Sequence, residues 1–374
     1  MRFLNFNSEL IDQIEKFKVQ IPLIAKLRHP GIKTKHWEMI SSAVGFTVAS
    51  SMEMTLQEFL SLDLGRWNDQ ISEITNKASN EYNIETSLDQ MDNELQTQQF
   101  VSKEFKDTNQ YILTQIDDIV SLVDDQLVTT QTLLTSPFIA PNKKRALERL
   151  TFLRLSHDIL DQWIECQRGW LYLQPIFTGT SIQRKLFRES QNWSSVDRTW
   201  SAIMNQTHKH PEFNNVMHRD NLLNDLKTSN GLLESITQGL NAYLEAKRHG
   251  FPRFFFLSND ELIEILSHTK DFDQIQKSMN KLFEYVQTIN VNQELKITAM
   301  NDDGLETVQF QNLIDGNTPE IEDWLNAFEE EMKTTLRLEI KKCLETSKET
   351  PKEKWISQYP AQAVLIANQI IWTQ

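Results

Sequence analysis

Apolar side chains recur at three- and four-residue steps along several long segments of this chain. In residues 115–134, for example, Ile116, Ile119, Val123 and Leu127 follow one another at this spacing. An α-helix turns once every 3.6 residues, so the spacing places these side chains on one helical face. The pattern predicts a long amphipathic helix whose apolar stripe packs against a neighbouring element.

Three further segments show the same helical spacing. One follows Pro141, one spans residues 220–247, and one begins after Pro319, a residue that suits the first helical turn. Several of these helices would reach about 25 residues, or roughly 40 Å at 1.5 Å per residue. Long helices with one main stripe each are suited to pack side by side in bundles. Their expected inward-facing side chains are Leu147, Leu150, Leu153, Ile159, Leu160 and Trp163, then Leu222, Leu223, Leu226, Leu233, Ile236, Leu240 and Leu244, and finally Trp324, Phe328, Met332, Leu336 and Ile340.

Glycine and proline are scarce, because the 374 residues contain only 10 of each. Sheet-rich folds and nucleotide-cradling loops use glycine at tight turns and where the backbone approaches a ligand closely. The abundant Gln, Glu, Lys and Leu residues tolerate or favour helix. Composition therefore agrees with the periodicity in predicting a mainly α fold.

Two places in the sequence read as short β-hairpins. Residues 100–105 and 111–113 flank a polar turn, and residues 295–300 and 307–310 flank a second turn that contains Asp-Gly at 303–304. Asp-Gly between apolar runs is a strong hairpin signal. Both hairpins are too small to be domains, so we expect them to be inserts in a helical rod.

The charge balance and the cysteine content narrow the choice of partners and compartment. The net charge is −14 and the isoelectric point is near 5.1, whereas affinity for nucleic acid comes largely from Lys and Arg. No stretch approaches 18 apolar residues, and the N-terminus lacks the continuous apolar core of a signal peptide. Cys166 and Cys343 are the only cysteines, which fits a reducing compartment. We expect an intracellular protein with neither nucleic acid nor a membrane as partner.

The sequence lacks the usual patterns of catalytic and cofactor sites. No glycine is followed by lysine and no two glycines lie one residue apart, so neither the phosphate loop nor the dinucleotide fingerprint occurs. His208, His210 and His218 lie in a polar connector without a nearby cysteine, which favours surface histidines over zinc ligands. Cys166 lies between two tryptophans, and we expect a buried structural thiol. We predict no catalytic, cofactor-binding or metal-binding residue in this chain.

Two aromatic segments are more informative. Residues 170–177, WLYLQPIF, end a predicted long helix with bulky apolar groups and a proline stop. Residues 251–258, FPRFFFLS, place four phenylalanines directly before a capping box, Ser258 to Glu261, that starts another helix. Consecutive aromatic residues cannot share one helical face. The second segment is therefore expected to be extended or kinked, and buried from several sides.

Two interpretations of the aromatic segments remain open. They can form a core junction where helices meet, or a patch on which a partner docks, and the residues favour the junction. For Phe254–Phe256 we predict a structural role. On this interpretation, Phe255→Ala would destabilise the chain by about 3–5 kcal/mol if Phe255 is fully buried.

These segments resemble the linker region of dynein heavy chains, and the resemblance covers the whole chain, residues 1–374. Within the family, the patterns at 106–108 and 124–126 are similar to axonemal more than to cytoplasmic members. The similar stretches lie, in family order, at residues 5–46, 106–113, 124–138, 170–177, 251–262, 297–300 and 369–373. The signature residues that we expect at structural junctions are Trp170, Tyr172, Pro175, Phe177, Pro252, Arg253, Phe254, Phe255, Phe256, Asn259 and Asp260.

The resemblance implies a fold and a function. The family's linker is an elongated, arched rod of packed helical bundles that lies across a ring of AAA+ modules. ATP binding and hydrolysis in the ring bend and straighten the linker, which produces a power stroke along microtubules. The implied partners are the AAA+ ring of the same parent polypeptide, dynein intermediate and light chains, and, through the parent motor only, microtubules. ATP and Mg²⁺ would belong to the ring, and the implied location is the axoneme of a cilium or flagellum, otherwise the cytoplasm.

A second function stays open. The sequence contains no AAA+ module, stalk or tail, so we expect a fragment, a truncated gene product or an excised segment. As an alternative to the linker, the chain would be a free-standing, dynein-derived helical scaffold that binds axonemal or cytoskeletal partners. A phosphate loop encoded just downstream would favour the linker. Partners recovered without any dynein heavy chain would favour the scaffold.

Overall fold

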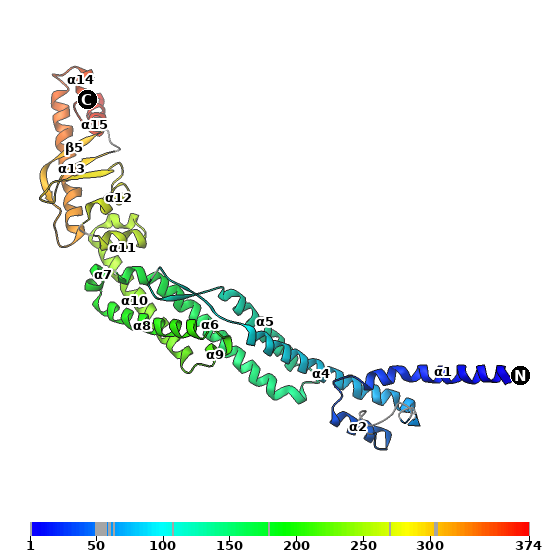
Figure 1. The fold of residues 1–374 in the computed structure, drawn as a ribbon. Coiled ribbons are helices and arrows are strands. Elements are labelled where there is room, and N and C mark those ends of the chain that lie inside the picture. The colour runs from blue at the N-terminus through cyan, green and yellow to red at the C-terminus, as the bar shows by residue number, and fades with distance from the viewer. Residues whose placement is uncertain are drawn as a thin grey trace. The chain divides into compact units, whose positions relative to one another are not determined.

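The computed structural model describes the chain as mostly helical, with two small antiparallel sheets (Figure 1). The prediction of a mainly α fold with small β inserts is confirmed, and the arched-rod shape stays a prediction. The described residues are 2–48, 58, 61–62, 64–106, 108–178, 180–268, 271–302 and 306–373. The chain divides into two compact units, which are unit 1 (Met1–Gln167 with Trp200–Lys227) and unit 2 (Arg168–Thr199 with Thr228–Gln374).

Unit 1 consists of helices and one two-stranded sheet. Strands β1 and β2 pair antiparallel with Val101 opposite Thr114, which confirms the first predicted hairpin. The elements of unit 1 are α1 (Arg2–Leu27), α2 (Thr34–Val44), η1 (Leu64–Trp67), α4 (Asn68–Thr97), β1 (Val101–Glu104), β2 (Tyr111–Thr114), α5 (Ile116–Leu134), η2 (Ala140–Asn142) and α9 (Phe213–Met217), with the first part of α6 (Lys143–Thr178), the end of α8 (Phe187–Lys209) and the start of α10 (Leu222–Gly250).

The apolar stripes predicted from the sequence form much of the core of unit 1. In α6, Leu150, Leu153 and Trp163 are buried as expected. Leu147 was expected to point inward but is 46% exposed, and Ala146 continues the buried row in its place. Adjacent residues on a helix point about 100° apart, so a stripe shifted by one position leaves Leu147 outside.

A buried polar network ties α4, α5 and α6 together. The Arg149 guanidinium pairs with Asp92 and donates a hydrogen bond of 2.6 Å to the Gln126 side-chain oxygen. The Gln126 amide donates in turn to the carbonyl of Met91 (3.2 Å) and to the Glu94 carboxylate (3.0 Å). Burial lowers the pKa of Arg149 to about 10. Because a buried charge is tolerated only with partners, this network fixes the relative positions of the three helices.

His36 connects the start of α2 to α4 as a buried neutral imidazole. The backbone N–H of Lys33 donates to His36 Nδ1 (3.0 Å), so this nitrogen carries no proton, and His36 Nε2 lies 3.2 Å from Glu81 Oε2. The ring is 1% exposed. Burial lowers the pKa of His36 and outweighs the hydrogen bond to Glu81, which acts in the opposite direction, while Lys35 and Lys77 lower the pKa further.

This geometry predicts that unit 1 loses stability in mild acid. The unfolded histidine titrates near about 6.5, above its folded pKa, so below that pH the unfolded state binds more protons than the folded state. The contribution of His36 should be complete above that pH and decline as the pH falls toward the folded pKa. Urea denaturation between neutral and mildly acidic pH would measure the decline. A His36→Gln variant should lose this part of the pH dependence, and an unchanged slope in the variant would contradict the assignment.

Unit 2 combines the remaining helices with a three-stranded sheet. The four predicted long helices are confirmed as α5, α6, α10 and α13. Within the described residues, no helix is both long and apolar enough to cross a membrane. The elements of unit 2 are the remainder of α6, α8 and α10, with α7 (Thr180–Lys185), η3 (Pro252–Phe256), α11 (Asn259–Ser267), α12 (Phe272–Leu282), β3 (Thr288–Val291), β4 (Lys296–Asn301), β5 (Thr307–Asp315), α13 (Ile321–Thr346), α14 (Lys352–Ile356) and α15 (Ala361–Thr373).

The second predicted hairpin is part of a larger sheet than expected. Strands β4 and β5 pair antiparallel as predicted, although the Asp-Gly dipeptide at 303–304 lies outside the described residues. A third strand, β3, pairs with the other edge of β4, with Ile289 opposite Met300. The segment 288–291 alternates polar and β-branched apolar residues, which is a strand signal. The segment was not predicted as a strand because it has only four residues.

Candidate functional site: an aromatic joint in unit 2

Residues 170–177, the first signature segment, pack α6 against α8. Trp170 is fully buried, and its indole N–H donates to the Asp197 carboxylate at 2.9 Å. Its ring stacks on Trp193 of α8 with centroids 6.3 Å apart, and Phe177 stacks on the same ring at 5.8 Å. Stacked rings of this size bury much apolar area and tolerate little sliding. These contacts support the junction role of Trp170 and Phe177, which stays a prediction.

Pro175 does not end α6, contrary to the prediction. The helix continues through it to Thr178. Proline removes only the hydrogen bond from its own position to the carbonyl four residues earlier, so the residues after Pro175 can continue the helix. Pro175 is exposed.

The second signature segment is a 3₁₀-helix, η3, and not an extended strand. A 3₁₀-helix has three residues per turn, so Phe251 and Phe254 lie on one face, and both are fully buried. Phe255 and Phe256 point elsewhere and are 58% and 68% exposed. The prediction that all these rings are buried is therefore wrong for Phe255 and Phe256. Pro252 starts η3 at its first turn, where its missing N–H is harmless.

The two buried rings belong to an aromatic cluster that links η3 to α12 and α13. Phe251 lies edge-on to Phe254 with centroids 5.0 Å apart, and it contacts Phe283 at 6.1 Å. Phe283, directly after α12, contacts Phe328 of α13 at 4.9 Å, and Phe328 contacts Phe310 of β5 at 5.3 Å. The chain of rings runs from the end of α10 to the sheet within unit 2.

Lys247, in the last turn of α10, fastens that helix to the start of α13. Its ammonium donates to Glu322 (2.5 Å) and to Glu320, and Lys185 of α7 also donates to Glu320 at 2.6 Å. The side chains of Lys247 and Glu322 are only 10% and 13% exposed. Burial alone would lower the pKa of Lys247, but its bonds to the two glutamates raise it above the usual value, so the ammonium stays charged.

Two arginines, one on either side of Gly250, make further hydrogen bonds between these elements. Arg248 donates to Asn259 Oδ1 (2.8 Å) at the start of α11 and to the carbonyl of Leu257 (3.3 Å). Arg253 donates to the Glu329 carboxylate of α13 (3.1 Å) and to the carbonyl that ends α12 (3.0 Å). Its guanidinium also lies 4.7 Å from the centre of the Phe283 ring. Arg253 is thus placed to hold three elements together.

The predicted capping box at Ser258 is present. The Glu261 backbone N–H donates to Ser258 Oγ, and the Ser258 backbone N–H donates to the Glu261 carboxylate at 2.8 Å. Burial raises the pKa of Tyr172, and the charge of Asp260, which lies in the same helical turn as Glu261, raises it further. The structure therefore brings Tyr172 of the first signature segment near Asp260 of the second.

We define the aromatic joint as residues 247–262 together with their contacts Phe283, Glu320, Glu322, Phe328 and Glu329. The signature residues named from the sequence supply part of it. Arg253 was among these signature residues, but Lys247, Arg248 and the partner glutamates were missed. A charged residue near a helix end suggests a favourable interaction with the helix dipole and reveals no tertiary partner.

The joint consists of ion pairs and aromatic rings. Cys166 of unit 1 is 1% exposed, and burial raises its pKa to about 12, which confirms the buried thiol expected there. Among the described residues, no group of three or more His, Cys, Asp or Glu is placed to hold a metal ion. Such an arrangement positions helices and resists their separation.

Comparison with known proteins identifies relatives of this sequence. A family model described as "Dynein heavy chain, N-terminal region 2" matches residues 2–343. Dynein axonemal heavy chain 1 of Homo sapiens is 36% identical over 96% of this chain and 8% of its own length. Dynein axonemal heavy chain 3 of Homo sapiens is 36% identical over 97% of this chain and 9% of its own length. Dynein axonemal heavy chain 12 of Mus musculus is 36% identical over 91% of this chain and 11% of its own length. The chain thus spans about a tenth or less of each relative.

Proposed function

Because the chain belongs to the dynein heavy chain family, we propose that it is the mechanical linker of an axonemal dynein motor, and that residues 1–374 form one functional linker region. In this proposal it hydrolyses nothing itself. It transmits the ATP-driven conformational change of an AAA+ ring in the same parent polypeptide, and the result is a power stroke along microtubules.

The aromatic joint is the observation that carries the proposal. A force-transmitting segment must not yield at the joints between its helices. Here Lys247 and Arg248 hold the end of α10 against α13 and α11, and Arg253 holds η3 against α12 and α13. The rings between them are closely packed, and packed protein interiors have low compressibility. Movement would then be confined to a few junctions, as in other hinge motions.

The proposal includes the partners and location that the motor would have. ATP and Mg²⁺ would be held by the AAA+ ring and not by this segment. Dynein intermediate and light chains would belong to the same dynein complex, and the site of action would be the cytoskeleton of a cilium or flagellum.

Labels at two exposed positions test whether the segment responds to nucleotide. Val128 of α5 and Leu365 of α15 are 61% and 64% exposed, so a fluorescent amino acid at each should leave the fold intact. In the purified heavy chain that contains this segment, energy transfer between the two labels should differ between the ATP-bound and ADP-bound motor. The same labels in the isolated 374-residue chain should give one value with or without nucleotide.

Two outcomes would argue against the linker. Identical energy transfer in all nucleotide states of a motor that moves microtubules would show that this segment does not change shape during the cycle. Recovery of the chain from cilia as a free 43.8 kDa protein bound to other components would favour the scaffold.

A further inference from the structure

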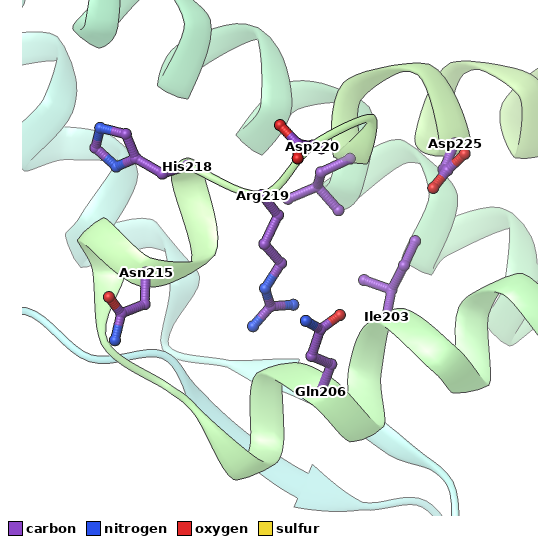
Figure 2. A pocket seen from close by; sticks show the side chains of 8 residues that line it. Ile203, Gln206, Asn215, His218, Arg219, Asp220 and Asp225 are labelled. Atoms are coloured by element: carbon purple, nitrogen blue, oxygen red, sulfur yellow. The ribbon is translucent and has the colours of Figure 1, made fainter.

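A pocket of about 400 Å³ lies in unit 1 where α8, α9 and α10 meet. Figure 2 shows the Arg219 side chain extended across it, with the guanidinium between the side chains of Asn215 and Gln206 in this view. The carboxylates of Asp220 and Asp225 lie elsewhere on the lining. The lining residues are Ile203, Gln206, Asn215, His218, Arg219, Asp220, Leu222 and Asp225.

Arg219 is held in place by neutral oxygen atoms. One guanidinium nitrogen donates to the Thr207 hydroxyl at 2.8 Å, and the other donates to the carbonyl of His210 at 3.3 Å. Both acceptors lie at the C-terminal end of α8, where a cation interacts favourably with the helix dipole. Guanidinium has five N–H groups, so these two bonds leave further donors for a ligand.

Among the described residues, no carboxylate lies within ion-pair distance of the Arg219 guanidinium. Every ion pair of the described chain lies elsewhere, although two aspartates line the same pocket. Burial lowers the pKa of Arg219, and no neighbouring carboxylate counteracts that effect. Arg219 is therefore a partly desolvated cation in a cleft. Its bonds to Thr207 and His210 hold one side of the guanidinium, and the other side is open to a ligand. Proteins bind anions with this arrangement.

The two aspartates decide which anion fits. They repel any incoming negative charge, and they repel a doubly charged phosphate about twice as strongly as a carboxylate. They also offer a place for a cation beside the bound anion. We propose that this pocket receives an Asp or Glu side chain of a partner protein, paired with Arg219, while a neighbouring Lys or Arg of the same partner pairs with Asp220 or Asp225.

Helical peptides that carry one Glu with a Lys one turn away test this proposal. Titrated into the full 374-residue chain by calorimetry, at least one spacing should bind about tenfold more tightly than the same peptide with Gln in place of Glu, a ratio that corresponds to about 1.4 kcal/mol. Arg219→Lys retains the positive charge at the end of α8 but loses the planar fork, so it should weaken binding while the chain stays folded.

Two further variants keep the test decisive if Arg219 variants unfold. Asp220→Asn and Asp225→Asn each remove one carboxylate from the lining and leave the two hydrogen bonds of Arg219 in place. At least one of the two variants should weaken the Glu-Lys peptide, while a peptide that has Glu and no Lys should bind both variants at least as tightly as the unmodified chain. Acetate and inorganic phosphate serve as probes of the anion alone, and acetate should compete better than phosphate. The proposal is overturned if Glu and Gln peptides bind equally, if none binds at millimolar concentration, or if phosphate competes more strongly than acetate.

Discussion

Phe254→Ala is expected to lower the free energy of unfolding of unit 2 by about 3–5 kcal/mol, whereas Phe255→Ala, one residue away, should change it by no more than about 1 kcal/mol. Phe254 is fully buried against Phe251, so its removal leaves a cavity in the ring cluster. Phe255 is 58% exposed and contributes mainly its contact with the Arg248 guanidinium, 5.8 Å from the ring centre.

Urea denaturation of the full chain measures both values, and hydrogen exchange of peptides from η3 and α13 assigns the loss to the joint. Phe256→Ala is a second matched control, because Phe256 is 68% exposed. Equal losses for Phe254→Ala and Phe255→Ala would restore the interpretation in which all three rings are packed inside, and would contradict the 3₁₀ geometry of η3.

Lys247→Ala should destabilise unit 2 by about 3–5 kcal/mol, the usual effect of removing one partner of a buried ion pair. Glu322 would remain 13% exposed and lose the ammonium that compensates its charge. Lys185→Ala removes the more exposed contact with Glu320, so its effect should stay below about 1 kcal/mol.

A double variant separates lost charge from lost packing. Lys247→Met with Glu322→Gln removes both buried charges and keeps the side-chain volume, so it should recover much of the stability that Lys247→Ala loses. If Lys247→Ala and Lys185→Ala have the same small effect, the contact between α10 and α13 is a surface ion pair and does not act as a clamp.

The sequence predicted the features of this fold that depend on local periodicity. Repeats of one apolar pattern allowed α5, α6, α10 and α13 to be recognised with nearly correct bounds. The equally long helices α1, α4 and α8 were not predicted. The exposure of Leu147 was missed because it depends on an apolar stripe shifted by one residue. Strand β3 was missed because it has only four residues. Pro175 was taken as a helix end, but a proline can be accommodated within a helix, as Pro22 also is in α1.

The joint was harder to predict than the helices. The aromatic residues in 251–256 were recognised from the sequence. Which of their rings face inward depends on whether the segment has three or 3.6 residues per turn, and composition does not determine that number. The clamps join Lys247 to Glu322 and Arg253 to Glu329, pairs separated by about 75 residues. Such long-range pairs have no signature in a single sequence.

The central claim is that this segment transmits mechanical work without generating it, and the aromatic joint is the place to break that transmission. In a purified heavy chain that contains the segment, Lys247→Ala should leave the basal ATPase rate close to that of the unmodified motor, while microtubule gliding slows several-fold. Lys185→Ala should leave both unchanged. If gliding persists at full speed in a Lys247→Ala motor whose joint is shown by hydrogen exchange to be loosened, the account is contradicted.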